Sequence, residues 1–209
     1  MGEILKALAA AGLDRNTLVV FTSDNGATTN HGSSNGPLRG KKGTVFEGGI
    51  RVPCLAHWPG KIPAGAVCDE PAGLIDLLPT AAAISGAALP TNRVLDGRDL
   101  TPLLTAKPGA RSPHEALFVF NRDTLAAVRA EKWKLHLASG ELYDLEADIA
   151  ESTSVATEHP AVVKRLRAFA AAALEDLGDD SGRHPGRNAR PPGRVENPRF
   201  LIHHDGAVR

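Results

Sequence analysis

Apolar residues at the start of the chain first follow helical spacing and then form one short, continuous run. The helical positions are Ile4, Leu5, Leu8 and Ala11. Gly12 follows them as a plausible C-cap, which predicts a short helix. The run at 17–22 is rich in β-branched residues and predicts a strand buried on both faces, as in a parallel sheet. A helix, a short loop and a buried strand form half of an α/β unit, so we expect an α/β architecture.

Downstream of this strand, the pattern predicts another strand, a helix and a boundary. Residues 52–58 form the second strand-like run, and the helix is expected to begin at Asp76 as its N-cap and to stop at Gly86. The Lys-Pro-Gly sequence at 107–109 is typical of a break between subdomains. We therefore expect residues 1–110 to form an α/β portion of the protein.

Four short strand candidates then follow one another closely. They cover residues 116–120, 125–130, 132–137 and 141–145. Alternation of apolar and polar residues is clearest in the third, and an antiparallel meander is the simplest arrangement. An apolar stripe between Pro160 and Gly178 predicts a helix that covers one face of this sheet. Residues 111–178 are thus expected to form a small α+β subdomain.

Residues 179–209 differ from the rest in composition. From Ser181 onward the chain has six arginines, four prolines and four glycines but only two acidic residues, a net charge of +4. This predicts a solvated, disordered extension or, alternatively, an electrostatic tether to an anionic surface or polymer. The whole chain has a formal net charge of +0, which favours neither a nucleic-acid nor a membrane partner. No apolar run reaches the ~18–20 residues of a membrane span.

Candidate chemistry begins directly after the first predicted strand. Asp24 and Asn25 follow the apolar run, and Gly26 permits a turn that could direct both side chains to one point. A carboxylate oxygen beside an amide oxygen suits a hard cation such as Ca²⁺ or Mg²⁺. The alternative is an ordinary Asp-Asn-Gly turn that closes a strand.

A second group of polar residues follows within twenty positions. Arg39, Lys41 and Lys42 lie among glycines, which would allow an oxyanion to approach the lysines closely. The alternative is a solvated basic loop. His31, in the preceding polar loop, could contact a substrate, although a histidine in such a loop is more often incidental.

Further motifs extend this pattern along the chain. In chain order they are Ser-Asp-Asn-Gly at 23–26, Pro-Leu-Arg-Gly at 37–40, Lys-Gly-Thr at 42–44, Glu-Gly-Gly-Ile-Arg-Val-Pro at 47–53 and Trp-Pro-Gly at 58–60. Together they resemble the C-terminal half of a formylglycine-dependent (type I) sulfatase, or arylsulfatase, in the alkaline-phosphatase-like superfamily. The resemblance covers roughly residues 1–178. It implies the C-terminal part of an α/β sandwich followed by the small α+β subdomain.

The resemblance also implies roles for particular residues. Asp24 and Asn25 correspond to two calcium ligands, and Lys42 corresponds to the lysine that contacts the sulfate group. Lys41 is the less favoured of the two lysines, and Arg39 is expected near the site without a catalytic role. The implied activity is calcium-dependent hydrolysis of a sulfate ester, carried on a small molecule or a glycan.

The family's nucleophile motif does not occur in this sequence. Formylglycine is made from the first residue of a Cys/Ser-x-Pro-x-Arg motif, which neither Cys54, nor Cys68, nor any serine matches. The paired aspartates that complete the family's calcium site do not occur either. We therefore expect both in an N-terminal half that would act as a partner, and we expect no turnover by this chain alone. The two cysteines could pair, but the apolar run around Cys54 favours two buried thiols.

Two other functions stay open at this stage. A phosphonate or phosphate ester hydrolase of the same superfamily would differ in its nucleophile and metal ligands. A non-catalytic anion-binding module would keep the lysines without any nucleophile. Calcium titration separates the last possibility, because tight binding by the chain alone would favour a self-sufficient module.

Overall fold

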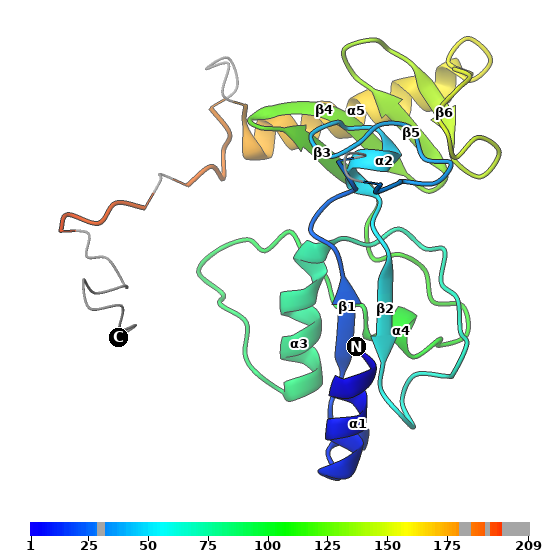
Figure 1. Cartoon of the computed structure of the whole chain (residues 1–209). Coiled ribbons are helices and arrows are strands. Elements are labelled where there is room, and N and C mark those ends of the chain that lie inside the picture. The colour runs from blue at the N-terminus through cyan, green and yellow to red at the C-terminus, as the bar shows by residue number, and fades with distance from the viewer. Residues whose placement is uncertain (29–31, 180–184, 191–192, 198–209) are drawn as a thin grey trace.

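Two antiparallel sheets organise the chain in a computed structural model, which describes residues 1–28, 32–179, 185–190 and 193–197 (Figure 1). The helices and strands in chain order are α1 (Gly2–Ala10), β1 (Val19–Thr22), α2 (Glu47–Ile50), β2 (Cys54–His57), α3 (Leu77–Ser85), α4 (Thr101–Leu104), β3 (Leu117–Asn121), β4 (Thr124–Ala130), β5 (Trp133–His136), β6 (Leu142–Asp144) and α5 (Pro160–Leu177). Short 3₁₀ helices precede β1 and α3. The described residues thus form a mixed α/β structure, which confirms the predicted fold class.

The first sheet differs from the prediction for its first strand. We expected β1 to lie buried in a parallel sheet, but it pairs antiparallel with β2, with Phe21 opposite Leu55. These two side chains are 50% and 60% exposed. The apolar run indicates a strand that avoids water, yet it carries no information about the direction of its neighbour or about the segment that covers it. The location of both strands is confirmed, and the parallel, doubly buried setting is wrong for the described residues.

The helix predicted after Asp76 is present as α3, and it ends at Gly86 with a φ of 72°. Asp76 occupies the N-cap position, but its side chain does not cap this helix. Its buried carboxylate instead accepts hydrogen bonds from the N–H groups of Gly73 at 2.8 Å and Arg98 at 2.7 Å. The same carboxylate lies 2.7 Å from Nε2 of His114. Asp76 therefore joins three segments, which extends its role beyond that of a helix cap.

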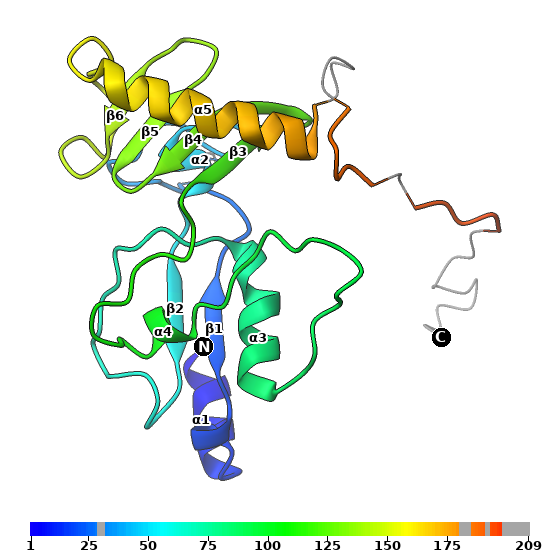
Figure 2. The same ribbon diagram turned by 180° about the vertical axis from the view of Figure 1, so that it is seen from behind.

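The second sheet is the predicted meander. Its strands follow the order β3–β4–β5–β6, and every neighbouring pair is antiparallel. Helix α5 covers one face of this sheet, as Figure 2 shows from behind. The buried side chains between them include Val128, Leu135, Leu142, Leu166 and Ala170. The alternation in β5 and the apolar stripe of α5 therefore meet in one core, as the sequence predicts.

The opposite face of the second sheet is covered by a segment from the N-terminal part of the chain. We call the residues before β3 the N-terminal part and those from β3 onward the C-terminal part. Figure 1 shows α2 in front of the sheet, on the side away from α5. The side chains of β4 and β5 that point away from α5 reach this segment. Arg129 and Lys134 contact Glu47, and the His136 ring packs against Phe46. The sequence pattern predicts one covering helix, and the structure adds this second cover.

Two further properties concern cysteines and membranes. Cys54 and Cys68 are free thiols, but both are exposed rather than buried. The apolar run around Cys54 does not bury it, because Cys54 and Leu55 lie on opposite faces of β2 and both are exposed. None of the helices that the structure describes has the length and apolar character needed to cross a membrane.

Candidate functional site

The candidate cation ligands lie where the chain leaves β1, in the turn at residues 24–26, which we call the cation turn. Asp24 Oδ1 accepts a hydrogen bond from the Asn25 N–H at 2.9 Å, which tightens the turn. Asn25 donates from Nδ2 to the carbonyl oxygen of Gly26 at 3.0 Å. Because the amide nitrogen of Asn25 makes this hydrogen bond, its amide oxygen points away from the Gly26 carbonyl. Asp24 is exposed and Asn25 is half-buried, so both can offer oxygen atoms at one end of the strand.

Gly26 fixes this turn against α2. Its N–H donates to the carbonyl oxygen of Gly49 at 3.0 Å. A Cβ atom at position 26 would lie 1.8 Å from the carbonyl oxygen of Gly48, far inside van der Waals contact. The glycine is required here for the close approach of two backbone segments, in addition to the turn that the sequence indicates.

Asn35 joins the cation turn to the basic loop, which carries Lys41 and Lys42. The sequence does not single this residue out. Its Oδ1 accepts from the Ala27 N–H at 2.7 Å, while its Nδ2 donates to the carbonyl oxygens of Ala27 at 3.1 Å and Gly40 at 3.0 Å. The Lys42 N–H donates to the same Ala27 oxygen at 3.0 Å. The two predicted halves of the site are thus hydrogen-bonded neighbours. The sequence gives no signal for Asn35, because its role depends on contacts with backbone groups of two other segments.

We call residues 40–46 the Lys42 loop. Thr44 closes its tip, since its N–H and its hydroxyl both donate to the Lys41 carbonyl at 2.9 and 2.8 Å. Gly40 and Gly43 both have a φ of 86°, which is the left-handed region that favours glycine. The side chains of Lys41 and Lys42 are exposed on this tip, where an anion can reach them.

Arg39 is directed toward the second sheet rather than toward the cation turn. Its Nη1 donates to the carbonyl oxygen of Glu151 at 2.8 Å and lies 3.5 Å from the Tyr143 hydroxyl. The guanidinium also stacks on Phe46, 4.0 Å from the ring centre. These contacts occupy Arg39 in holding the loop. His31, the remaining candidate for substrate contact, lies outside the described residues.

A buried cluster of charges lies behind the Lys42 loop. Lys134, which is 0% exposed, lies 3.0 Å from both Glu47 Oε1 and Glu151 Oε1. His136 Nε2 lies 2.8 Å from the same Glu151 oxygen. Arg129 approaches Glu47 Oε2 at 3.5 Å, outside hydrogen-bonding geometry. We call Glu47, Lys134, His136 and Glu151 the buried charge cluster; no local pattern in the sequence predicts it.

The pKa values of Glu151, in the cluster, and of Arg129, beside it, are both shifted. Burial alone would raise the pKa of Glu151, but the hydrogen bonds from His136, from the Glu47 amide and from Lys134 outweigh it and lower that pKa. Burial lowers the pKa of Arg129, against the opposing effect of Glu47. Glu151 therefore remains a carboxylate at neutral pH, as its contacts with cationic and N–H donors require.

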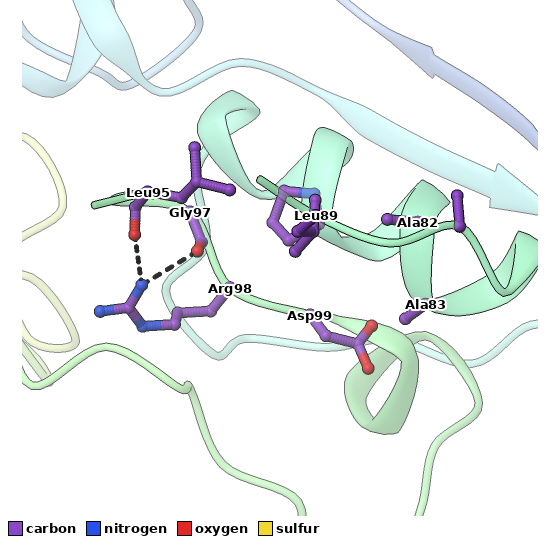
Figure 3. A pocket seen from close by; sticks show the side chains of 9 residues that line it. Ala82, Ala83, Leu89, Leu95, Gly97, Arg98 and Asp99 are labelled. Atoms are coloured by element: carbon purple, nitrogen blue, oxygen red, sulfur yellow. Dashed lines mark hydrogen bonds between the residues drawn. The ribbon is translucent and has the colours of Figure 1, made fainter. Parts of the chain in front are cut away.

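A separate hollow of about 400 Å³ lies beside α3. Figure 3 shows Ala82 and Ala83 of α3 facing the segment that carries Leu95, Arg98 and Asp99. Arg98 donates from Nη1 to the carbonyl oxygens of Leu95 at 2.6 Å and Gly97 at 3.1 Å, so its charge is satisfied locally. None of the predicted site residues that the structure describes lines this hollow.

The cation turn fits a hard divalent cation in donor type. Asp24 supplies carboxylate oxygens and Asn25 an amide oxygen, and calcium prefers ~6–8 such oxygen ligands. Among the residues that the structure describes, no group of three or more His, Cys, Asp or Glu side chains could hold a metal ion. The two side chains can therefore be part of a cation site whose other ligands come from elsewhere.

Comparisons with known proteins agree with this geometry. Residues 1–87 match the sequence pattern that defines the Sulfatase family. The chain is 49% identical over 137 residues to a steryl-sulfatase of Mus musculus, covering 62% of this chain and 22% of the relative. It is 42% identical over 192 residues to arylsulfatase A of Bos taurus, covering 87% of this chain and 35% of the relative.

Solved structures give the same result. The PsFucS1 sulfatase from Pseudoalteromonas sp. superimposes with a TM-score of 0.77 at 28% identity, covering 90% of this chain and 42% of that one. The crystal structure of Ps i-CgsB in complex with k-i-k-neocarrahexaose gives a TM-score of 0.75 at 31% identity, covering 86% and 41%. The fold and site thus define a protein of the alkaline-phosphatase-like class of hydrolases.

Within that class, residues 1–87 match the sulfatase family and the relatives named here are sulfatases, which confirms the resemblance predicted from the motifs. The chain spans less than half of the length of each of these relatives.

Proposed function

We propose that this site takes part in the hydrolysis of sulfate esters. Asp24 and Asn25 are two oxygen ligands of a divalent cation, Ca²⁺, and the Lys42 ammonium binds the sulfate group. The observation that carries the proposal is the hydrogen bond from the Lys42 N–H to Ala27, which keeps the basic loop beside the cation turn. The match to the sulfatase family supports the same assignment.

The chemistry of the two halves is complementary. A bound Ca²⁺ would supply positive charge to the sulfate ester oxygens as the reaction proceeds. Lys42 binds the same anion as a compact point charge, on a loop whose glycines leave room for the substrate. Lys41 lies beside it but is tied into the loop tip through its backbone, so we assign it a secondary electrostatic role. We assign Arg39 to holding the loop, because its guanidinium already contacts Glu151 and Phe46.

The proposed reaction needs groups that these 209 residues do not supply. A formylglycine nucleophile and further cation ligands have to come from a segment equivalent to the rest of a sulfatase, on the same polypeptide or on another. An exposed apolar surface on the first sheet, on the 3₁₀ helix before α3 and on the first turn of α3 supports such a partner. It includes Phe21, Leu55, Leu74, Ile75 and Leu78. We propose that this surface receives that segment.

The substrate class is a sulfate ester of a small molecule or a glycan. The names of the relatives include steryl-sulfatase, arylsulfatase A and N-acetylgalactosamine-6-sulfatase, and one solved neighbour is complexed with a neocarrahexaose. The substrates that the sulfatase names imply share a sulfate group, which is the part of the substrate that Lys42 would contact. We therefore propose recognition of the sulfate by this chain, independently of the group that carries it.

The proposal is tested by complementation. The chain is assayed with an aryl sulfate and an aryl phosphate, alone and after co-expression with the N-terminal segment of a sulfatase that carries formylglycine. We expect no turnover alone, sulfate ester hydrolysis in the complex, and loss of that activity in Lys42→Ala and in Asp24→Ala. Turnover by the chain alone above the Lys42→Ala control contradicts the proposal. Faster hydrolysis of the phosphate would favour the phosphate ester hydrolase instead.

A further inference from the structure

One residue of the C-terminal part contacts both ends of the Lys42 loop. Arg39, directly before the loop, donates from Nη1 to the carbonyl oxygen of Glu151 at 2.8 Å. Glu47, directly after the loop, donates its backbone N–H to Glu151 Oε2 at 2.6 Å. These contacts join positions 112 and 104 residues apart in sequence. We propose that Glu151 is a positioning residue that holds the Lys42 loop in the shape needed to bind an anion.

The environment of Glu151 suits this role. Its side chain is 0% exposed, and its second carboxylate oxygen, Oε1, lies 2.8 Å from His136 Nε2 and 3.0 Å from Lys134 Nζ. Both carboxylate oxygens are therefore engaged, Oε2 by the Glu47 N–H at the end of the loop and Oε1 by two side chains of β5. A carboxylate fixed in this way by two cationic or N–H groups has little freedom to turn away from the Glu47 amide. Charge-assisted hydrogen bonds in a buried site are also the stronger kind.

The backbone of Glu151 adds a second reason. Its φ is +53°, a left-handed conformation that is unfavourable for a residue with a Cβ atom. In this conformation the carbonyl oxygen meets Arg39 while the carboxylate meets Glu47, so both arms of one residue reach the loop. Strained residues of this kind persist where surrounding contacts hold them, often beside functional sites.

The loop's own hydrogen bonds explain why two anchor points are enough. Gly48 donates its N–H to the Arg39 carbonyl at 2.7 Å, which closes the loop at its base. Thr44 closes its tip through Lys41. A loop that is closed at base and tip can still rotate as a unit about its base. The hydrogen bonds from the Lys42 N–H to Ala27 and from Asn35 to Gly40 tie the loop to the cation turn. Contacts from Glu151 to both sides of the base add a tie to the second sheet and link the orientation of Lys42 to it.

The test uses the full chain and limited digestion with trypsin, which cleaves after Lys41 and Lys42. Glu151→Gln keeps the size of the side chain but removes its charge. We expect cleavage in the loop to be at least about tenfold faster, because losing a buried charge-assisted hydrogen bond changes an opening equilibrium by that order. Mass spectrometry of the early fragments identifies the sites. Equal loop cleavage in the two proteins would overturn the proposal.

Two controls separate loop positioning from a general loss of stability. Cleavage after Lys164 and Arg165 in α5 reports opening of the fold, and its acceleration is expected to be clearly smaller than that of cleavage in the loop. If loop and helix sites accelerate together, Glu151 only stabilises the fold and the proposal is wrong. Glu131→Gln removes an exposed carboxylate that meets Arg165 at 3.2 Å, and it should leave cleavage in the loop unchanged.

A second variant keeps the test decisive if Glu151→Gln does not fold. Arg39→Gln breaks one of the two contacts and leaves the buried charge cluster intact. We expect it to accelerate cleavage after Lys41 and Lys42 as well, again without a matching change in α5. An Arg39→Gln chain whose loop is cleaved at the wild-type rate overturns the proposal independently.

The anion-binding part of this inference rests on the proposed function. Inorganic sulfate allows the roles of Lys42 and Glu151 to be tested separately. If Lys42 binds sulfate as proposed, added sulfate slows cleavage after Lys42 in the wild-type chain and protects Glu151→Gln less well. A wild-type chain that sulfate does not protect contradicts the role of Lys42. The loop comparison without sulfate then still decides whether Glu151 positions the loop.

Discussion

The N-terminal and C-terminal parts of this chain bury their apolar residues very differently. Among described residues, every large apolar side chain that is exposed lies within positions 1–94, except Phe118 and Val195. The buried apolar residues show the reverse, since all but Ala82 and Leu100 lie between positions 125 and 173. The second sheet has a helix on one face and α2 on the other, whereas β1 and β2 form an open pair (Figure 1). The C-terminal part is therefore the more self-sufficient unit.

This difference shows where the candidate site draws its order. The site residues belong to the incompletely covered part, yet their loop is held by charges buried against the complete sheet. A loop in a part of the chain that has little core of its own can thus be held in place by the core of the neighbouring part. Breaking contacts on the two sides should have unequal effects, which the following variants measure.

The largest effect is expected at Lys134. Lys134→Ala removes the cation between Glu47 and Glu151, and it leaves two buried carboxylates without their shared partner. We expect a loss of about 3–5 kcal/mol in the free energy of unfolding, measured by urea denaturation followed by circular dichroism. Lys132→Ala is the matched control, because Lys132 pairs with Asp144 at 2.6 Å in a much more accessible position. Similar losses in the two variants would contradict the importance of burial.

A core truncation on the same side is expected to have the next largest effect. Leu166→Ala in α5 removes a side chain that is 0% exposed and packs with Leu135 and Leu142. The resulting cavity is expected to cost about 2–5 kcal/mol in the same denaturation experiment. Leu74→Ala is the control from the other part, because Leu74 is 44% exposed. A comparable loss for Leu74 would show that the N-terminal part has a core of its own.

The free energy of unfolding is expected to depend on pH through Glu151. The pKa of Glu151 is lowered from its ordinary value of 4.5, so the unfolded state binds a proton before the folded state does. The stabilisation is therefore present above about pH 4.5 and is lost as the pH falls through the lower folded-state value. Urea denaturation between pH 7 and pH 3 should show a steeper loss for wild type than for Glu151→Gln. Parallel curves for the two proteins would mean that Glu151 does not contribute to acid sensitivity.

Much of the fold could be predicted from the sequence because its signals are local. Strand alternation in β5, the stripe of α5 and the glycine at position 178 each reflect short-range periodicity or capping. The direction of β1 could not be predicted, since a continuous apolar run does not specify its neighbour. The site residues Asp24, Asn25 and Lys42 stood out by residue type and spacing. Their roles as ligands and sulfate contact are still predictions.

The contacts that organise the site could not be predicted in the same way. Asn35 acts through a side-chain amide placed between two backbone segments, and a polar residue in a loop gives no such signal. Glu151 acts on residues more than a hundred positions away, through contacts that only the tertiary fold creates. Lys134 and His136 look like the polar positions of an exposed strand face. Their burial depends on α2, which a local pattern in β5 cannot indicate.

The smallest effect on the stability of the chain itself is expected for a substitution on the open apolar surface. Leu55→Ser replaces a side chain that is 60% exposed on β2, so the free energy of unfolding should change by less than about 0.5 kcal/mol. The same change should weaken complementation by the N-terminal segment of a sulfatase, because it removes apolar area from the proposed contact. Phe118→Ser serves as the control, since Phe118 is 37% exposed but belongs to β3 of the other part. Activity assays of the co-expressed complexes measure the difference. Equal complementation by wild type and Leu55→Ser would mean that this surface is not where the segment docks.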